Sequence, residues 1–213
     1  MSAAQPSSSP SPRPASRRDQ ILDAALACFA SAGFRGTTTR EIASRVGLTE
    51  AALYRHFASK EALYAAIIAR KIEAPDLTAR LEAAAAAGDD RAVLGGLART
   101  LIERVDADPA FIRILLFTAL EGHSLAEPFF AARVRRIREF LSGYIARRIE
   151  AGAFRAVDPV IAARAFLGMV SDYLNVRFVF QQQLAYPQPI EEVVETFVSL
   201  FLTGIRAQSG EAR

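Results

Sequence analysis

The chain has 213 residues, of which 51% are apolar and 23% are charged, and its formal net charge is +3. This composition is typical of a globular protein and excludes a highly charged disordered chain. The single cysteine, Cys28, excludes a disulfide framework, and no apolar run approaches the roughly 18–20 residues that cross a bilayer. We therefore expect a cytoplasmic protein that does not span a membrane.

The two ends of the chain differ from the rest. Residues 1–15 are rich in Ser, Pro and Ala and lack the apolar segment of a signal peptide, so they are predicted to be a disordered tail, as are residues 208–213. Between the tails alanine is frequent and β-branched runs are scarce, which favours an all-α fold. We predict two units, a small one over 16–62 and a larger helical one over 63–207.

The first expected helix begins at Ser16, which forms a capping box with Asp19. Apolar residues then recur at helical spacing until Gly33, which can adopt the left-handed conformation that ends a helix, with Phe34 as the apolar contact beyond it. Because a two-helix motif is too small to bury its own core, this helix is expected to cover the segment that follows.

That segment contains two short helices joined by a glycine turn. Thr38 and Glu41 form a second capping box, Gly47 suits a left-handed turn, and Thr49 and Ser59 are good N-caps for the next two helices. This order of elements is that of a helix-turn-helix, in which the second helix, here about residues 50–56, enters the DNA major groove. We therefore predict an N-terminal three-helix DNA-binding domain.

The region from about Arg17 to Arg70 resembles the DNA-binding domain of the TetR family of bacterial transcriptional regulators. The resemblance covers about a quarter of the chain and involves many positions at fixed spacing. The matching residues are Ile21, Ala24, Ala25, Phe29, Gly33, Thr38, Ile42, Ala43, Gly47, Leu48, Thr49, Leu53, Tyr54, His56, Phe57, Ser59, Lys60, Glu61 and Leu63.

The first turn of the recognition helix is expected to meet base edges. Arg55 either reads guanine O6 and N7 or is a solvated charge. Glu50 either accepts from a cytosine amino group or complements the helix dipole, and Ala51 and Ala52 offer apolar contacts. The resemblance implies a phosphate contact for Lys60. The complete predicted set is Thr38, Thr39, Arg40, Thr49, Glu50, Ala51, Ala52, Tyr54, Arg55, His56 and Lys60.

Several of these residues have a simpler structural interpretation. Thr38 and Thr49 cap helices whether or not they touch DNA, and Tyr54 is either near the DNA backbone, as the resemblance implies, or a core residue. The distribution of charge agrees with a DNA-binding unit, since residues 13–73 hold ten Lys and Arg against six Asp and Glu, whereas the remaining residues hold sixteen against seventeen.

The rest of the chain is predicted to form further helices. Pro75 ends or kinks the first of them, and Gly88, Gly122 and Gly152 act as stops. The expected ranges are 60–74, 76–87, 89–105, 108–122, 127–152, 158–183 and 189–206.

The last predicted helix is apolar around most of its circumference, so it needs partners on several sides. The resemblance implies a homodimer in which the last two helices of each subunit form a four-helix bundle. The alternative is a helix buried centrally within one subunit. The residues predicted for the interface are Val193, Phe197, Phe201 and Ile205.

Aromatic residues of the middle helices are core residues by default, but the resemblance implies a small-molecule pocket among them. The predicted pocket residues are Phe111, Phe117, His123, Phe130, Tyr144, Tyr173, Asn175 and Arg177. A largely apolar effector with one or two polar groups fits such walls. The arginines at 133, 135, 136 and 138 are expected to form a solvated face, with a second nucleic-acid site as the remote alternative.

Enzyme chemistry is not expected. Two histidines, His56 and His123, and one cysteine do not make a plausible zinc site, and the chain has no phosphate-binding glycine loop or nucleophile elbow. We predict no metal and no cofactor. The expected function is a homodimeric repressor that binds a pseudo-palindromic operator in double-stranded DNA and is released by a small apolar effector. The alternatives are a constitutive regulator without a ligand and a protein-interaction module with a degenerate DNA head.

Overall fold

The computed structural model describes residues 16–182 and 187–207, so the predicted tails over 1–15 and 208–213 lie outside the described residues. The described chain is all-α, as predicted, with an isolated bridge between Phe154 and Arg206. The α-helices are α1 (Arg17–Gly36), α2 (Thr39–Arg45), α3 (Glu50–Tyr54), α4 (Lys60–Ile72), α5 (Glu82–Ala87), α6 (Asp90–Ala107), α7 (Pro109–Glu121), α8 (Glu127–Phe129), α9 (Arg135–Glu150), α10 (Pro159–Leu174) and α11 (Ile190–Ile205).

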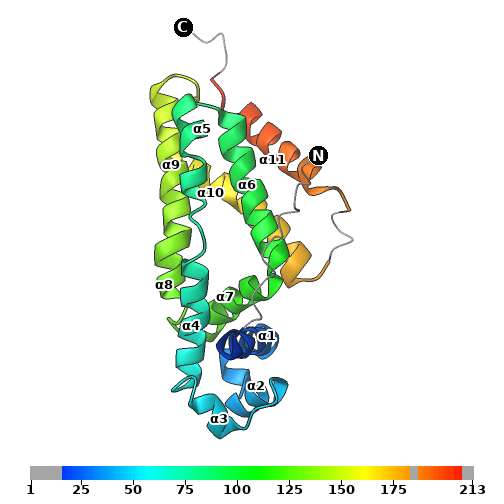
Figure 1. Ribbon diagram of the computed structural model, residues 1–213. Helices are drawn as coiled ribbons and strands as arrows, with labels where there is room; N and C mark the ends of the chain where they lie inside the picture. The colour runs from blue at the N-terminus through cyan, green and yellow to red at the C-terminus, as the bar shows by residue number, and fades with distance from the viewer. Residues whose placement is uncertain (1–15, 183–186, 208–213) are drawn as a thin grey trace, which may run out of the picture.

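Helices α1, α2 and α3 form a small head at one end of the molecule, and α4 leads from this head into the larger helical part (Figure 1). Helix α7 lies across the junction and packs against α1 (Figure 1). In the larger part, α10 packs against α9 and α6, and α11 packs against α6 and α10.

The core is divided between two clusters of buried side chains. One cluster contains the interior of the head, including Ile21, Phe29 and Leu53, but it continues into Ile67 of α4 and Ile114 of α7. Packing is therefore continuous across the predicted boundary between residues 62 and 63, because the short head helices need the faces of α4 and α7 to complete their core.

Three predicted helix ranges are wrong in detail. The range 76–87 begins with a 3-10 turn, Thr78–Arg80, and α5 starts only at Glu82. The reason is local, since Oδ1 of Asp76 accepts from both the backbone N–H and the hydroxyl of Thr78 at 3.0 Å, and this turn competes with a regular helix.

The two long helices are interrupted by π-helical segments. The helix predicted from residue 127 divides into α8, a π segment over Phe130–Val134 (η2) and α9. The helix predicted from residue 158 divides into α10 and a π segment over Asn175–Val179 (η3). Such segments are frequent at functional sites.

The arginine run does not form a simple solvated face. Arg133 is half-buried, and its guanidinium donates to the carbonyls of Ile72 and Ala74 at the end of α4. Arg136 lies 2.7 Å from Asp76. The π segment therefore holds the C-terminal end of α4, which is the helix that leads from the head into the larger helical part.

Candidate nucleic-acid interface and its junction with the larger domain

The helix-turn-helix is held by the capping contacts that the sequence predicts. The hydroxyls of Thr38, Thr49 and Ser59 accept from the backbone N–H groups three residues on, at 3.1–3.2 Å. Gly47 has a φ of +66°, and the Leu48 N–H donates to the Ala43 carbonyl at 2.9 Å. These contacts fix the turn that sets the direction of α3.

Helix α3 presents most of the predicted DNA-binding residues to solvent. Leu53 and Phe57 are buried beneath it. The exposed side chains on and around α3 are Thr49, Glu50, Ala51, Tyr54, Arg55 and His56. The helix ends at Tyr54, with Arg55 as its C-cap, so it is shorter than predicted.

Ala52 is a correction to the predicted set. It is buried, with 8% of its surface exposed, whereas Glu50, Ala51 and Tyr54 of the same helix are exposed. It therefore offers a base little surface.

Tyr54 is 46% exposed, so the interpretation of this residue as a core residue is wrong. Its hydroxyl lies 3.3 Å from the Thr39 hydroxyl, which also donates to the carboxylate of Glu50. The first turn of α2 and both ends of α3 are thereby joined in one polar group at the surface. Thr38 and Arg40 are exposed beside it.

Lys60 holds the end of α1. Its ammonium donates to the carbonyls of Phe34 and Thr37 at 2.8 and 2.9 Å and lies 4.4 Å from the centre of the Phe34 ring. The phosphate contact predicted for Lys60 therefore belongs to a side chain that also joins the start of α4 to the end of α1. An ammonium has three N–H donors, so a phosphate contact is compatible with these two bonds.

Arginines of α1, which the sequence analysis did not single out, fasten α1 to the helix-turn-helix. Arg17 donates to the Val46 carbonyl at 2.6 Å, and Arg18 donates to the His56 carbonyl at 3.3 Å and stacks 4.2 Å from the Phe57 ring centre. No short motif marks these contacts, because they join residues far apart in the chain.

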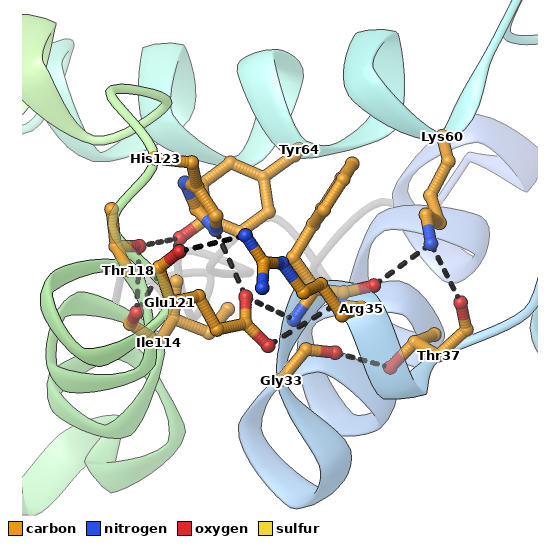
Figure 2. Close-up of polar contacts among 10 residues, drawn as sticks. Gly33, Arg35, Thr37, Lys60, Tyr64, Ile114, Thr118, Glu121 and His123 are labelled. Atoms are coloured by element: carbon orange, nitrogen blue, oxygen red, sulfur yellow. Dashed lines mark hydrogen bonds and ion pairs between the residues drawn. The ribbon is translucent and has the colours of Figure 1, made fainter.

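The junction between the head and the larger domain is built around a kink in α1 (Figure 2). Gly33 has φ +72° and ψ −179°, so it kinks the helix. The predicted stop at Gly33 is wrong, because helical structure resumes and continues to Gly36. The Glu121 carboxylate, at the end of α7, accepts from the N–H groups of Phe34 and Arg35, both at 3.1 Å. Arg35 donates in return to the Glu121 carbonyl at 3.1 Å.

Other side chains of α7 strengthen the junction. Nε of Arg113 donates to the Ala30 carbonyl at 2.8 Å. The buried hydroxyls of Tyr64 and Thr118 are hydrogen-bonded to each other, and burial raises the pKa of Tyr64. Arg113 of α7 therefore donates to a carbonyl of α1, and the Glu121 carboxylate of α7 accepts from two N–H groups of α1.

His123 belongs to this junction rather than to a separate pocket. Its Nε2 lies 3.0 Å from the Glu121 carboxylate (Figure 2). Its ring packs edge-on against Phe34 and Tyr64. Its Nδ1 is buried and has no hydrogen-bond partner among the described residues.

The structure does not bring the eight predicted pocket residues around one cavity. Tyr144 and Tyr173 are fully buried in the core, and the Tyr144 hydroxyl donates to Asp90 at 2.6 Å. Phe111 packs against Phe129, with ring centres 4.9 Å apart. Phe117 approaches the kink at Gly33, Phe130 begins the segment η2, and Asn175 and Arg177 lie on η3.

The predicted interface residues on α11 divide into two groups. Val193 and Ile205 are buried within the subunit, which corrects their assignment to a face between subunits. Phe197 and Phe201 are partly buried against Tyr173 and Phe166, with ring centres 6.3 and 5.2 Å apart.

The exposed apolar residues of this region were not predicted. Ile161 of α10 is 67% exposed and Leu200 of α11 is 63% exposed. Both line a groove of about 550 Å³ between these helices, together with Phe201. The sequence shows an α11 that is apolar all round, but it does not show which side the subunit's own core uses.

No helix in residues 16–182 and 187–207 is long and apolar enough to cross a membrane. The same ranges contain no group of three or more His, Cys, Asp or Glu side chains that is arranged to hold a metal ion.

Comparisons with known proteins agree with this architecture. Residues 21–67 match the family model described as bacterial regulatory proteins, tetR family. Residues 92–204 match the model described as AefR-like transcriptional repressor, C-terminal domain.

Individual relatives cover most of the chain. The HTH-type transcriptional repressor KstR2 of Rhodococcus jostii (strain RHA1) is 32% identical over 155 residues, which are 71% of this chain and 74% of that protein. The HTH-type transcriptional repressor Rv1474c of Mycobacterium tuberculosis is 28% identical over 182 residues, 85% of this chain and 90% of that protein. The crystal structure of the TetR family transcriptional regulator PfmR from Thermus thermophilus is similar with a TM-score of 0.67 and 28% identity, covering 87% of this chain and 98% of that one. The chain therefore belongs to the TetR family of bacterial transcriptional regulators, whose members bind DNA.

Proposed function

We propose that this regulator is a homodimeric, sequence-specific repressor that a small, largely apolar molecule releases from a pseudo-palindromic operator. The observation that carries the proposal is the pairing of an exposed recognition helix with a polar junction to the larger domain. The side chains of Glu50, Ala51, Tyr54 and Arg55 are exposed to solvent. Glu121 and Arg113 of α7 are hydrogen-bonded to α1, which belongs to the same head.

The proposed DNA complex follows from the geometry of such motifs. Two recognition helices would enter successive major grooves, which are about 34–36 Å apart. Arg55 would read a guanine edge, and the exposed Thr38 and Arg40 would lie near the backbone. Two half-sites require two subunits, and the groove bounded by Ile161 and Leu200 offers an apolar surface for a second copy.

The proposed response to a ligand uses the junction. Because α7 contacts α1 directly, a ligand that shifts α7 changes the position of the head in each subunit. DNA and ligand would then be reciprocally coupled, typically by about 1–3 kcal/mol. Two relatives are named repressors, which supports repression as the direction of control.

The test is a titration of the purified protein against fluorescently labelled DNA from upstream of its own coding region, over a range of salt concentrations. We expect salt-dependent binding with a dimer on each site, and release by at least one member of a library of apolar compounds. Binding without release by any compound would favour a constitutive regulator controlled by its abundance. Absence of sequence-specific DNA binding would favour the alternative of a protein-interaction module with a degenerate DNA head.

A further inference from the structure

A pocket lies beside the junction, where the start of α7 meets the π segment η3. Its volume is about 350 Å³, which is at the small end of the range for ligand sites. Arg113 comes to its wall from α7, Arg177 and Phe178 come from η3, and Asp106 lies near the end of α6.

The chemistry of the wall favours an anion. Arg113 and Arg177 are both half-buried, and Asp106 offsets one of their two charges. Pro109 and Ala110, in the first turn of α7, also line the pocket, so the positive end of that helix dipole faces the same space. A guanidinium binds a carboxylate through two parallel N–H bonds, and Phe178 supplies an apolar surface beside them.

We propose that this pocket takes the effector as a small organic acid, whose carboxylate binds Arg113 and Arg177 and whose apolar body lies against Phe178. The inference rests on the proposed function and adds to it the charge of the ligand and the place where it binds. The expected effector is therefore an anion rather than a neutral apolar molecule.

Arg113 connects this pocket to the DNA-binding head. Its Nε donates to the Ala30 carbonyl, one turn before the kink at Gly33. In an unbroken helix the Phe34 N–H would donate to Ala30, but here it donates to Glu121 at 3.1 Å. The bond from Arg113 is therefore part of what holds α1 where its regular helix is interrupted.

A carboxylate that binds Arg113 through Nε and one Nη would compete with the Ala30 carbonyl for the Nε–H. An ionised acceptor forms the stronger hydrogen bond, so ligand binding draws Arg113 toward the pocket and weakens its hold on α1. The head then loses the hydrogen bond from Arg113, while the bonds that involve Glu121 remain. This is a direct route from pocket to head that requires no large movement of the surrounding helices.

The first experiment tests the charge of the ligand. Butanoate, octanoate and phenylacetate, each with its uncharged amide, are titrated into the wild-type protein and the variants Arg177→Gln, Arg177→Lys and Arg138→Gln by calorimetry. We expect at least one carboxylate to bind about tenfold or more tightly than its amide. The preference should be lost in Arg177→Gln, partly kept in Arg177→Lys and unchanged in Arg138→Gln, whose arginine is exposed on α9. Equal affinities for every acid and its amide, or a preference that survives in Arg177→Gln, would overturn the assignment.

The second experiment tests the connection to DNA. Operator affinity is measured with and without a saturating amount of the preferred carboxylate, in the wild-type protein and in Arg113→Gln. We expect the acid to weaken operator binding by about fivefold or more in the wild type. In Arg113→Gln, the ratio of operator affinity without the acid to operator affinity with it should approach one. An undiminished ratio in Arg113→Gln would overturn this role. If the wild-type protein binds its operator but does not prefer the acids over their amides, only the assignment of the pocket is refuted. If it binds no operator, the proposed function is refuted.

Discussion

Glu121 lies so close to Gly33 that a Cβ on the glycine would overlap its Oε1 atom. The same carboxylate caps the two N–H groups that follow the kink. The close approach of α7 to α1, and with it the attachment of the DNA-binding head, therefore depends on a residue without a side chain at position 33.

Replacing Gly33 tests this dependence. Gly33→Ala combines a backbone conformation that is almost restricted to glycine with displacement of Glu121, so we expect a loss of about 2–4 kcal/mol in the free energy of unfolding. Urea unfolding measures it. The matched control is Gly152→Ala, which has a φ of +70° but no atom within 4 Å of the added Cβ, and which should lose only about 1–2 kcal/mol. Equal losses would show that the contact with Glu121 contributes nothing.

Arg55 and Lys60 are expected to affect DNA binding in different ways. Arg55→Ala should cost roughly 1–3 kcal/mol on the operator and relax specificity at one base pair, because the side chain is exposed at the end of the recognition helix. Lys60→Ala should weaken binding to all sequences alike and lower the salt slope by about one. Competition titrations with operators substituted at single positions distinguish the two.

Lys60 also stabilises the head, so its variant needs a second measurement. Loss of its bonds to the Phe34 and Thr37 carbonyls should reduce the free energy of unfolding by about 1–3 kcal/mol. Reduced stability together with an unchanged salt slope would leave Lys60 with a structural role and no phosphate contact.

The exposed apolar residues Ile161 of α10 and Leu200 of α11 offer a way to disrupt the proposed dimer without unfolding the subunit. Leu200→Glu places a charge on a side chain that is 63% exposed in the isolated subunit, so the subunit should stay folded while the dimer is lost. Sedimentation and operator binding measure the two effects. Phe201→Glu would be less informative, because Phe201 also packs against Phe166 inside the subunit.

Leu120→Glu is the matched control, since Leu120 is 84% exposed on α7, a different helix from the two that carry the groove. The Leu120→Glu variant should keep the sedimenting mass and the operator affinity of the wild type. A Leu200→Glu protein that still sediments as a dimer would place the interface elsewhere.

Asp76 predicts a dependence of stability on pH. Burial alone would raise its pKa, but hydrogen bonds from Thr78 and the nearby charges of Arg136 and Arg133 outweigh burial and lower it. A carboxyl group whose pKa is lowered in the folded state stabilises that state above its unfolded pKa of about 3.9, and this contribution is lost as the pH falls through the lowered value.

Asp76→Asn should therefore reduce the free energy of unfolding by about 1–2 kcal/mol at pH 7, and the difference from the wild type should narrow toward pH 3. Urea unfolding at both pH values measures this, with Glu103→Gln on the exposed surface of α6 as the control. A difference that is the same at both pH values would show that the charge of Asp76 is not the cause.

Local chemistry accounts for the part of the molecule that could be predicted from the sequence. Caps at Thr38, Thr49 and Ser59 and the left-handed glycine at 47 depend on contacts within a few residues, so the helix-turn-helix follows from its own residues. The all-α class follows likewise from composition and from helical periodicity.

Only the tertiary structure decides the functions of single side chains that meet across long stretches of the chain. The bond from Arg113 to Ala30, the caps from Glu121 and the anchoring of α4 by Arg133 join helices that no local pattern relates. The same holds for α11, whose apolar residues surround the helix, so that packing against α6 and α10 determines that Val193 is buried and Leu200 is left exposed. The sequence by itself determined the family and the DNA-binding head, because short-range contacts specify them, whereas the junction, the pocket and the exposed apolar face exist only where distant helices pack together.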